Sequence, residues 1–370
     1  MPAENDSSSI DASWRTTARR LLSPRRLRDS LTLTSPPSPR IAVIAGLQAA
    51  LSLLAATLLI SLTPWHHLIG FPALGALASL FGRYASARHR ARIVAICAIL
   101  LTVAVFVPSL ASYGGASSNA KLLLLALIAG CATLAVAHWQ LGGPGPVIFT
   151  FAAAGGLAPL GSWHSVAEQT LATAAGGAVA WAVCRMTDRL RSAELASLNM
   201  PVAPHRPFRH ELIAAARLTA GAATAALVAQ AIGWQHPAWA AIGALAVMQG
   251  GHLHITMSRA LQRMAGTIIG AFIAWVILSQ PLPPWGLIAI VAAFQFITEA
   301  VIGYNYALGQ ITVTPMALIM TYLAAPATAA NMPVERVLET LLGAGLGIVF
   351  AVMFSTVDDR VYLARRRDSR

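Results

Sequence analysis

The chain has 370 residues, of which 56% are hydrophobic and only 11% are charged, and its formal net charge at pH 7 is +12. A soluble fold of this length cannot bury so much apolar surface, so the composition excludes an ordinary soluble globular protein. A segment that crosses about 30 Å of hydrocarbon needs about 20 apolar residues and must pair its own backbone polar groups. The sequence therefore predicts an all-α polytopic membrane protein.

The chain begins with a segment rich in Ser, Pro and Arg, residues 1–40, which is predicted to be a disordered basic cytoplasmic tail. Apolar stretches then predict about twelve transmembrane helices, six in each half of the chain. In the first repeat, 41–186, they are 41–62, 68–82, 91–112, 120–138, 144–160 and 166–186. In the second repeat, 212–357, they are 212–232, 237–250, 260–279, 284–302, 306–324 and 334–355. A short cytoplasmic linker, 187–211, joins the repeats, and a basic cytoplasmic tail, 358–370, follows them.

The distribution of arginine predicts the topology, because loops rich in Lys and Arg stay in the cytoplasm. With twelve spans and a cytoplasmic N-terminus, only Lys121 and Arg336 are assigned to the outer side. Both termini are therefore expected in the cytoplasm. The same bias accounts for the positive net charge, so the lipid bilayer is an expected partner and nucleic acid is not.

The two halves share residues at a constant offset of 171 positions. Leu47 corresponds to Leu218, Arg88 to Arg259 and Arg92 to Arg263, and the dipeptide 188–189 recurs at 359–360. Because six spans per half is an even number, both halves would insert with the same orientation. Two parallel six-helix repeats related by a pseudo-twofold axis along the membrane normal are expected, with a pathway between them or within each half.

Three segments of the second half carry a family resemblance. They are His-Pro-Ala-Trp-Ala at 236–240 leading to Ala-Leu-Ala-Val-Met-Gln at 244–249, Ser-Arg-Ala-Leu-Gln-Arg-Met-Ala-Gly-Thr at 258–267, and Asn-Tyr-Ala-Leu at 305–308 followed by Thr-Pro at 314–315. In this order and spacing they resemble the fusaric-acid-resistance (FUSC) superfamily. The resemblance implies an inner-membrane transporter related to the aromatic-acid exporters and, more distantly, to the plant aluminium-activated malate transporters. The first half matches only through its arginines.

Two pairs of arginines are candidates for binding an organic anion. Arg259 and Arg263 are one helical turn apart and share a face, and Arg88 and Arg92 repeat the arrangement in the first half. A guanidinium stays charged and can hold a carboxylate through two parallel hydrogen bonds. The alternative is that all four residues anchor cytoplasmic helix ends to anionic lipid.

Three glutamates are candidates for proton coupling. Glu299 lies in an apolar span without an obvious local partner, and a charged carboxylate at membrane depth costs roughly 2.5–3.5 kcal/mol. Its alternative role is structural, at the membrane surface or paired with an arginine. Glu335 and Glu339 share a helix face at the start of the last span and are candidate proton acceptors on the exit side. Negative charge at a helix N-terminus is also stabilising in itself.

The joins between spans are candidates for a substrate cavity. Tyr304, Asn305 and Tyr306 lie at one join, and Thr314 precedes a proline in the following span. The corresponding join in the first half is the broken segment 142–146. Such breaks free backbone groups, which is tolerated where protein or a water-filled cavity replaces lipid. Tight turns with tyrosines at the membrane interface are the alternative, and His236 and Trp239 are likewise expected at the outer interface.

No metal site, cofactor or enzymatic activity is predicted. The pair His252 and His254 lacks nearby Asp, Glu or Cys, and the three cysteines are scattered among the spans. The expected function is proton-driven export of small, aromatic or otherwise hydrophobic carboxylic acids by alternating access. An anion channel, or a non-transporting envelope or scaffold protein, is the alternative. The expected soluble partner is the organic anion, and a homodimer is left open.

Overall fold

The computed structural model describes residues 33, 35–198, 207–249, 253–324 and 331–354, and this part of the chain is built from helices and contains no strand. Most of the predicted N-terminal tail, the tail 358–370 and His252 lie outside the described residues. The all-helical prediction is confirmed.

The helices follow the predicted spans closely. The first half contains α3 (Pro39–Ser61), η1 (His66–Leu68), α4 (Gly70–Ala76), η2 (Leu77–Leu80), α5 (Ala87–Tyr113), α6 (Ser118–His138), α7 (Pro146–Gly155), α8 (Trp163–Thr187) and α9 (Arg189–Ser197). The second half contains α10 (Phe208–Ile232), α11 (Ala238–Met248), α12 (Leu253–Leu278), α13 (Pro284–Val301), α14 (Tyr306–Ala324) and α15 (Met332–Met353).

The predicted count of twelve spans is not confirmed. Within the described residues, eight helices are long and apolar enough to cross a membrane: α3, α5, α6, α10, α12, α13, α14 and α15. The shorter apolar helices are 70–80, 146–155 and 238–248. At 1.5 Å per residue each of these rises only about 15 Å, roughly half of the hydrocarbon thickness. Helix α8 has 25 residues but is not among the eight, because its sequence is more polar.

The short helix α11 lies inside the protein instead of facing lipid. Every residue from Trp239 to Met248 is buried. Helix α15 packs against it through glycines, since a side chain on Gly343 would collide with the carbonyl oxygen of Ala240. Short helices are tolerated at membrane depth only where protein or a cavity surrounds their free ends. The shortness of α11 is therefore explained by its burial.

Helix termini follow local sequence rules. Ser38 caps α3, its hydroxyl accepting a hydrogen bond from the backbone N–H of Ile41 at 3.2 Å, and Ser117 caps α6 in the same way. Helices α13 and α15 begin with a proline in the first turn, where no intrahelical N–H is needed. Helix α10 ends at Gly233, whose φ of 90° is a conformation that favours glycine.

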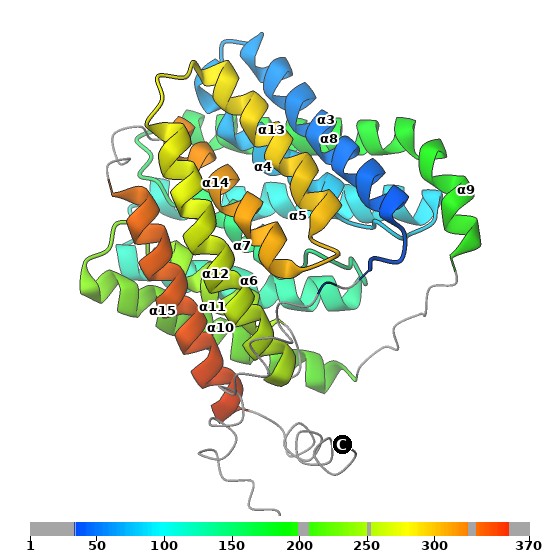
Figure 1. Ribbon diagram of the computed structural model, residues 1–370. Helices are drawn as coiled ribbons and strands as arrows, with labels where there is room; N and C mark the ends of the chain where they lie inside the picture. Colours follow the sequence, from blue (N-terminus) through cyan, green and yellow to red (C-terminus); the bar gives the residue numbers. More distant parts are fainter. Residues whose placement is uncertain (1–32, 34, 199–206, 250–252, 325–330, 355–370) are drawn as a thin grey trace, which may run out of the picture.

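The two halves are interleaved. Helix α3 of the first half packs against α13 of the second, and α10 of the second packs against α6 of the first (Figure 1). Within the halves, α8 packs against α5 and α4, and α15 packs against α12 and α11. Thus the first helix of each half contacts the fourth of the other half, while the sixth contacts the second and third of its own.

Candidate functional site

A cavity of about 1000 Å³ lies between the two halves, and residues from both line it. Its charged residues are Arg83, Arg259, Arg263, Arg336, Glu211 and Glu299. Its amides are Gln140, Gln249, Gln295 and Gln310. Most of the remaining wall is apolar and includes Phe151, Ile242 and Met316. The four guanidinium groups outnumber the two carboxylates, so the cavity is suited to an anion.

Several polar residues of the cavity lie at helix ends. Arg83 follows η2, Gln249 follows α11, Glu299 lies in the last turn of α13, and Tyr306 begins α14. Arg336, in the second turn of α15, lines the same cavity.

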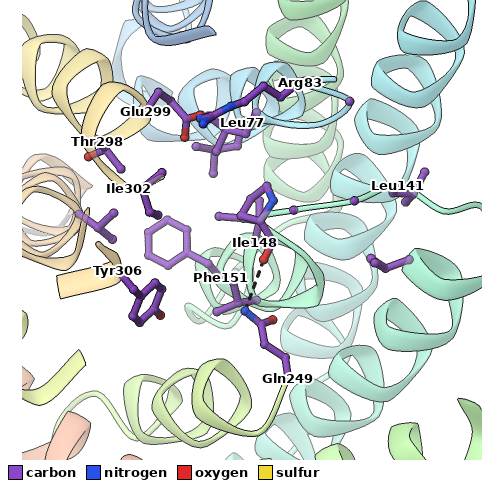
Figure 2. Close-up of a pocket in the computed structure, with 18 of the residues that line it drawn as sticks. Leu77, Arg83, Leu141, Ile148, Phe151, Gln249, Thr298, Glu299, Ile302 and Tyr306 are labelled. Carbon is purple, nitrogen blue, oxygen red and sulfur yellow. Dashed lines mark hydrogen bonds and ion pairs between the residues drawn. The ribbon is translucent and has the colours of Figure 1, made fainter. Parts of the chain in front are cut away.

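Glu299 is paired with an arginine of the other half. Its carboxylate forms an ion pair with Arg83, 216 residues away in sequence, and Figure 2 shows the two side chains pointing toward one another. The side chains are only 8% and 14% exposed. The alternative that Glu299 is paired with an arginine is therefore the one that the structure shows. Its partner comes from a loop of the first half, which no local sequence pattern could indicate.

Buried groups hold the loop that carries Arg83. The guanidinium of Arg191 donates hydrogen bonds to the backbone carbonyl oxygens of Arg83 and Ala85 and pairs with Asp188 at 2.6 Å. Arg90 reaches Asp188 at 3.9 Å and donates to Gln48 at 2.6 Å. Burial lowers the pKa of the Arg83 guanidinium from its ordinary value. Hydrogen bonds from Arg191 thus hold the backbone of the loop in place, while the Arg83 side chain lines the cavity.

Arg259 and Arg263 come together with Tyr306 in the cavity wall. Arg263 is 3% exposed, and its Nη1 donates to the Tyr306 hydroxyl at 3.2 Å and to Gln310 Oε1 at 3.1 Å. Its Nε has no hydrogen-bond partner within the described residues. The Arg259 guanidinium carbon lies 5.7 Å from the centroid of the Tyr306 ring, in cation–π contact. The structure therefore places both residues of this predicted pair in the cavity wall.

The corresponding pair in the first half does not reach the cavity. Arg88 and Arg92 are exposed and do not line it, whereas Arg90 between them is buried. Two residues correspond to a rotation of about 200° around a helix, so an inward Arg90 turns both neighbours outward. Residues related by the offset of 171 positions thus correspond in sequence, but their surroundings in the structure differ.

Three other predicted site residues, Tyr304, Asn305 and Thr314, lie outside the lining of the cavity. Asn305 is buried, and its Oδ1 accepts a hydrogen bond from the N–H of Ala307 at 2.8 Å at the start of α14. Thr314 is fully buried and packs close to Gly270 of α12. Neither Asn305 nor Thr314 lines the cavity, and Tyr304 does not line it either.

A second cluster surrounds the start of α15. The imidazole Nδ1 of His236 lies 2.9 Å from Glu335 Oε2, and its backbone N–H donates to Glu339 Oε1 at 3.2 Å. The His236 ring stacks on Trp239 with 4.3 Å between centroids, and Trp239 is only 5% exposed. The expectation of an interfacial Trp239 is therefore wrong. Neither Glu335 nor Glu339 lines the cavity, but Arg336 between them does.

Sequence reasoning missed Arg83 and Arg336 as site residues. In the sequence, Arg83 contributes only to the cytoplasmic excess of arginine, and the topology assigns Arg336 to the outer side. An arginine within the apolar α15 was itself a signal, because charges inside a span rarely face lipid. Across the described part of the chain, no group of three His, Cys, Asp or Glu side chains could hold a metal ion.

The fold and cavity define a polytopic helical membrane protein. Residues 224–350 match the family described as fusaric acid resistance protein-like. The chain is 35% identical over 126 residues to an uncharacterized membrane protein, YvaC, of Bacillus subtilis (strain 168). That alignment covers 33% of this chain and 20% of the relative, so the chain spans far less than the relative's length. No solved structure matches significantly. The match over residues 224–350 confirms that the motifs of the second half resemble the fusaric acid resistance protein-like family.

Proposed function

We propose that the protein is a transporter, and not an enzyme, that exports small organic carboxylic acids, chiefly aromatic ones, across the bacterial inner membrane. The observation that carries this proposal is the cavity between the halves, in which four arginines and two carboxylates are set in a mostly apolar wall. Its volume of about 1000 Å³ is large enough for a small organic molecule. Its excess of guanidinium groups favours a negative charge on that molecule.

Recognition combines charge with an apolar surface. Arg259 and Arg263 present donors on one side of the cavity, and the free Nε of Arg263 is available to a carboxylate oxygen. Tyr306 and Phe151 project into the same space (Figure 2). An aromatic acid can therefore place its carboxylate on the arginines and its ring against apolar and aromatic side chains.

Glu299 supplies the proton coupling. The Glu299 carboxylate is ion-paired with the Arg83 guanidinium. A substrate carboxylate that binds Arg83 therefore has to displace the Glu299 carboxylate. The displaced carboxylate is no longer neutralised, and proton uptake then relieves its charge. Anion and proton therefore favour each other in the cavity and cross together. Because acid and proton move in the same direction, the inward proton gradient does not drive this export, in contrast to the proton-driven export expected from the sequence. Accumulation of the acid in the cytoplasm supplies the outward gradient instead.

The interleaved packing supports an internal repeat. In this proposal the halves are two parallel repeats related by a pseudo-twofold axis, because equivalent helices have equivalent packing partners. The cavity then lies on the axis, with its polar mouth and both chain termini in the cytoplasm. Cysteine labelling of the linker 187–211 from the outside would contradict this topology.

Reconstitution into liposomes tests the function. Uptake of a panel of radiolabelled aromatic acids, benzoate first, is measured with and without an imposed pH gradient. The expected result is saturable uptake that an acidic exterior stimulates and that Arg263→Gln weakens. Unitary currents in a planar bilayer without proton coupling would instead indicate an anion channel. The absence of flux for every acid would leave a scaffold role.

A further inference from the structure

A fourth cavity arginine, Arg336, has an unusual position. It lies in the second turn of α15, lines the cavity and is only 2% exposed. Its guanidinium carbon lies 5.0 Å from the centroid of the Trp239 ring, which is itself stacked on His236. Such cation–π contact fixes the direction of the guanidinium without using its N–H groups.

Two of the three guanidinium nitrogens of Arg336 are not satisfied by the described part of the protein. Neither Nε nor Nη1 has a hydrogen-bond partner anywhere in the described ranges. Glu335 contacts the His236 ring. Glu339 interacts electrostatically with Arg336, but its Oε1 accepts from the His236 backbone N–H and it forms no ion pair with Arg336 within 4.0 Å. No carboxylate of the described residues lies within 4.0 Å of the Arg336 guanidinium. A buried cation without a hydrogen-bonded anion is costly, which points to a ligand that supplies one.

We propose that Arg336 binds the carboxylate of the substrate within the cavity. This inference rests on the proposed function, because the ligand is the organic anion named there. Arg259 and Arg263, on α12, form one binding position in the cavity wall, and Arg336, in the second turn of α15, forms another. Ile242, Phe151 and Met316 line the cavity as well and provide the apolar surface for the body of the acid. An aromatic monocarboxylate is therefore the class of ligand that fits.

Binding by the purified full chain in detergent tests this assignment. The probes are benzoate, benzamide and acetate, measured by equilibrium dialysis at a fixed pH. Benzamide keeps the ring and the shape of benzoate but lacks its charge, so the ratio of the two affinities reports recognition of the anion. A merely structural role of Arg336 would lower stability or alter both affinities without removing the preference for benzoate.

The variants are Arg336→Gln and Arg336→Lys, with Arg92→Gln as the control because Arg92 is exposed and outside the cavity. Loss of a charged hydrogen bond lowers the preference for benzoate over benzamide about tenfold or more in Arg336→Gln. A smaller loss is expected in Arg336→Lys, which keeps the charge but not the planar donors. Arg92→Gln should match the wild type.

The outcomes separate the two proposals. A wild-type preference in folded Arg336→Gln overturns the assignment of Arg336 and leaves the proposed function intact. If Arg336→Gln does not insert, Arg336→Lys decides, because an unchanged benzoate preference in that variant also overturns the assignment. A wild-type protein that binds neither benzoate nor acetate would overturn both proposals.

Discussion

Replacing Glu299 with Gln tests how substrate and proton are coupled. The change keeps the size and polarity of the side chain but removes its charge and its titration. In the wild type, a carboxylate that binds Arg83 must break the ion pair between Arg83 and Glu299, whose side chains are almost excluded from solvent. In Glu299→Gln, the same anion competes only with a neutral amide.

The size of the effect follows from the two kinds of hydrogen bond. A bond between charged groups contributes about 1.5–3 kcal/mol, and a neutral one contributes about 0.5–1.5 kcal/mol. The difference, about 1–1.5 kcal/mol, corresponds to roughly five- to tenfold tighter anion binding in Glu299→Gln. Wild-type binding should also strengthen as pH falls, because protonation of Glu299 removes the competitor. The variant should lack this dependence.

The assay combines binding with flux at matched protein density. Benzoate binding is measured over about pH 6 to 8, where the ligand stays ionised, and uptake is driven by an acidic exterior. We expect gradient-driven uptake to collapse in Glu299→Gln while binding persists. Glu211→Gln is the matched control, since Glu211 lines the same cavity but is not the ion-pair partner of Arg83. Weaker binding with intact gradient-driven flux in Glu299→Gln would refute the coupling role.

Three further variants test the site and the fold. Replacing Arg259 and Arg263 together with Gln should raise the substrate concentration for half-maximal transport at least tenfold without affecting insertion; normal kinetics would reduce them to lipid anchors. Arg191→Gln should lower the free energy of unfolding by about 3–5 kcal/mol because it leaves Asp188 without its closest cation, and thermal unfolding in detergent measures this against the exposed Arg189→Gln. Gly343→Leu should destabilise by about 1–3 kcal/mol or more through overpacking against α11, whereas Gly345→Leu, which meets open space, should not.

Helix positions could be predicted from the sequence because apolar runs and their boundaries are local. Pro284 and Pro333 mark helix starts, and the predicted span 284–302 became α13 almost residue for residue. The number of crossings could not be predicted in the same way. An apolar run such as 238–248 has the same composition whether it faces lipid or lies inside a bundle. Only its neighbours in space decide between these positions.

The candidate site was predictable where one helix face carries it. Arg259 and Arg263 are one turn apart, and the structure turns both toward the cavity. The pairing of Glu299 with Arg83 joins residues 216 positions apart, and no periodicity encodes such a contact. Arg88 and Arg92 have the same spacing as Arg259 and Arg263, yet they lie on the exposed face of α5. Spacing alone therefore shows that two residues share a helix face but not which way that face points.

The interleaving of the halves has a consequence for biosynthesis. Helix α3 emerges first, but its partner α13 is completed only after more than 200 further residues have been made. During that interval the surface of α3 that will contact α13 has only lipid or an insertion factor beside it. A first half synthesised alone would keep this surface uncovered. Two halves produced as separate polypeptides should therefore assemble only when they are made together in the same membrane.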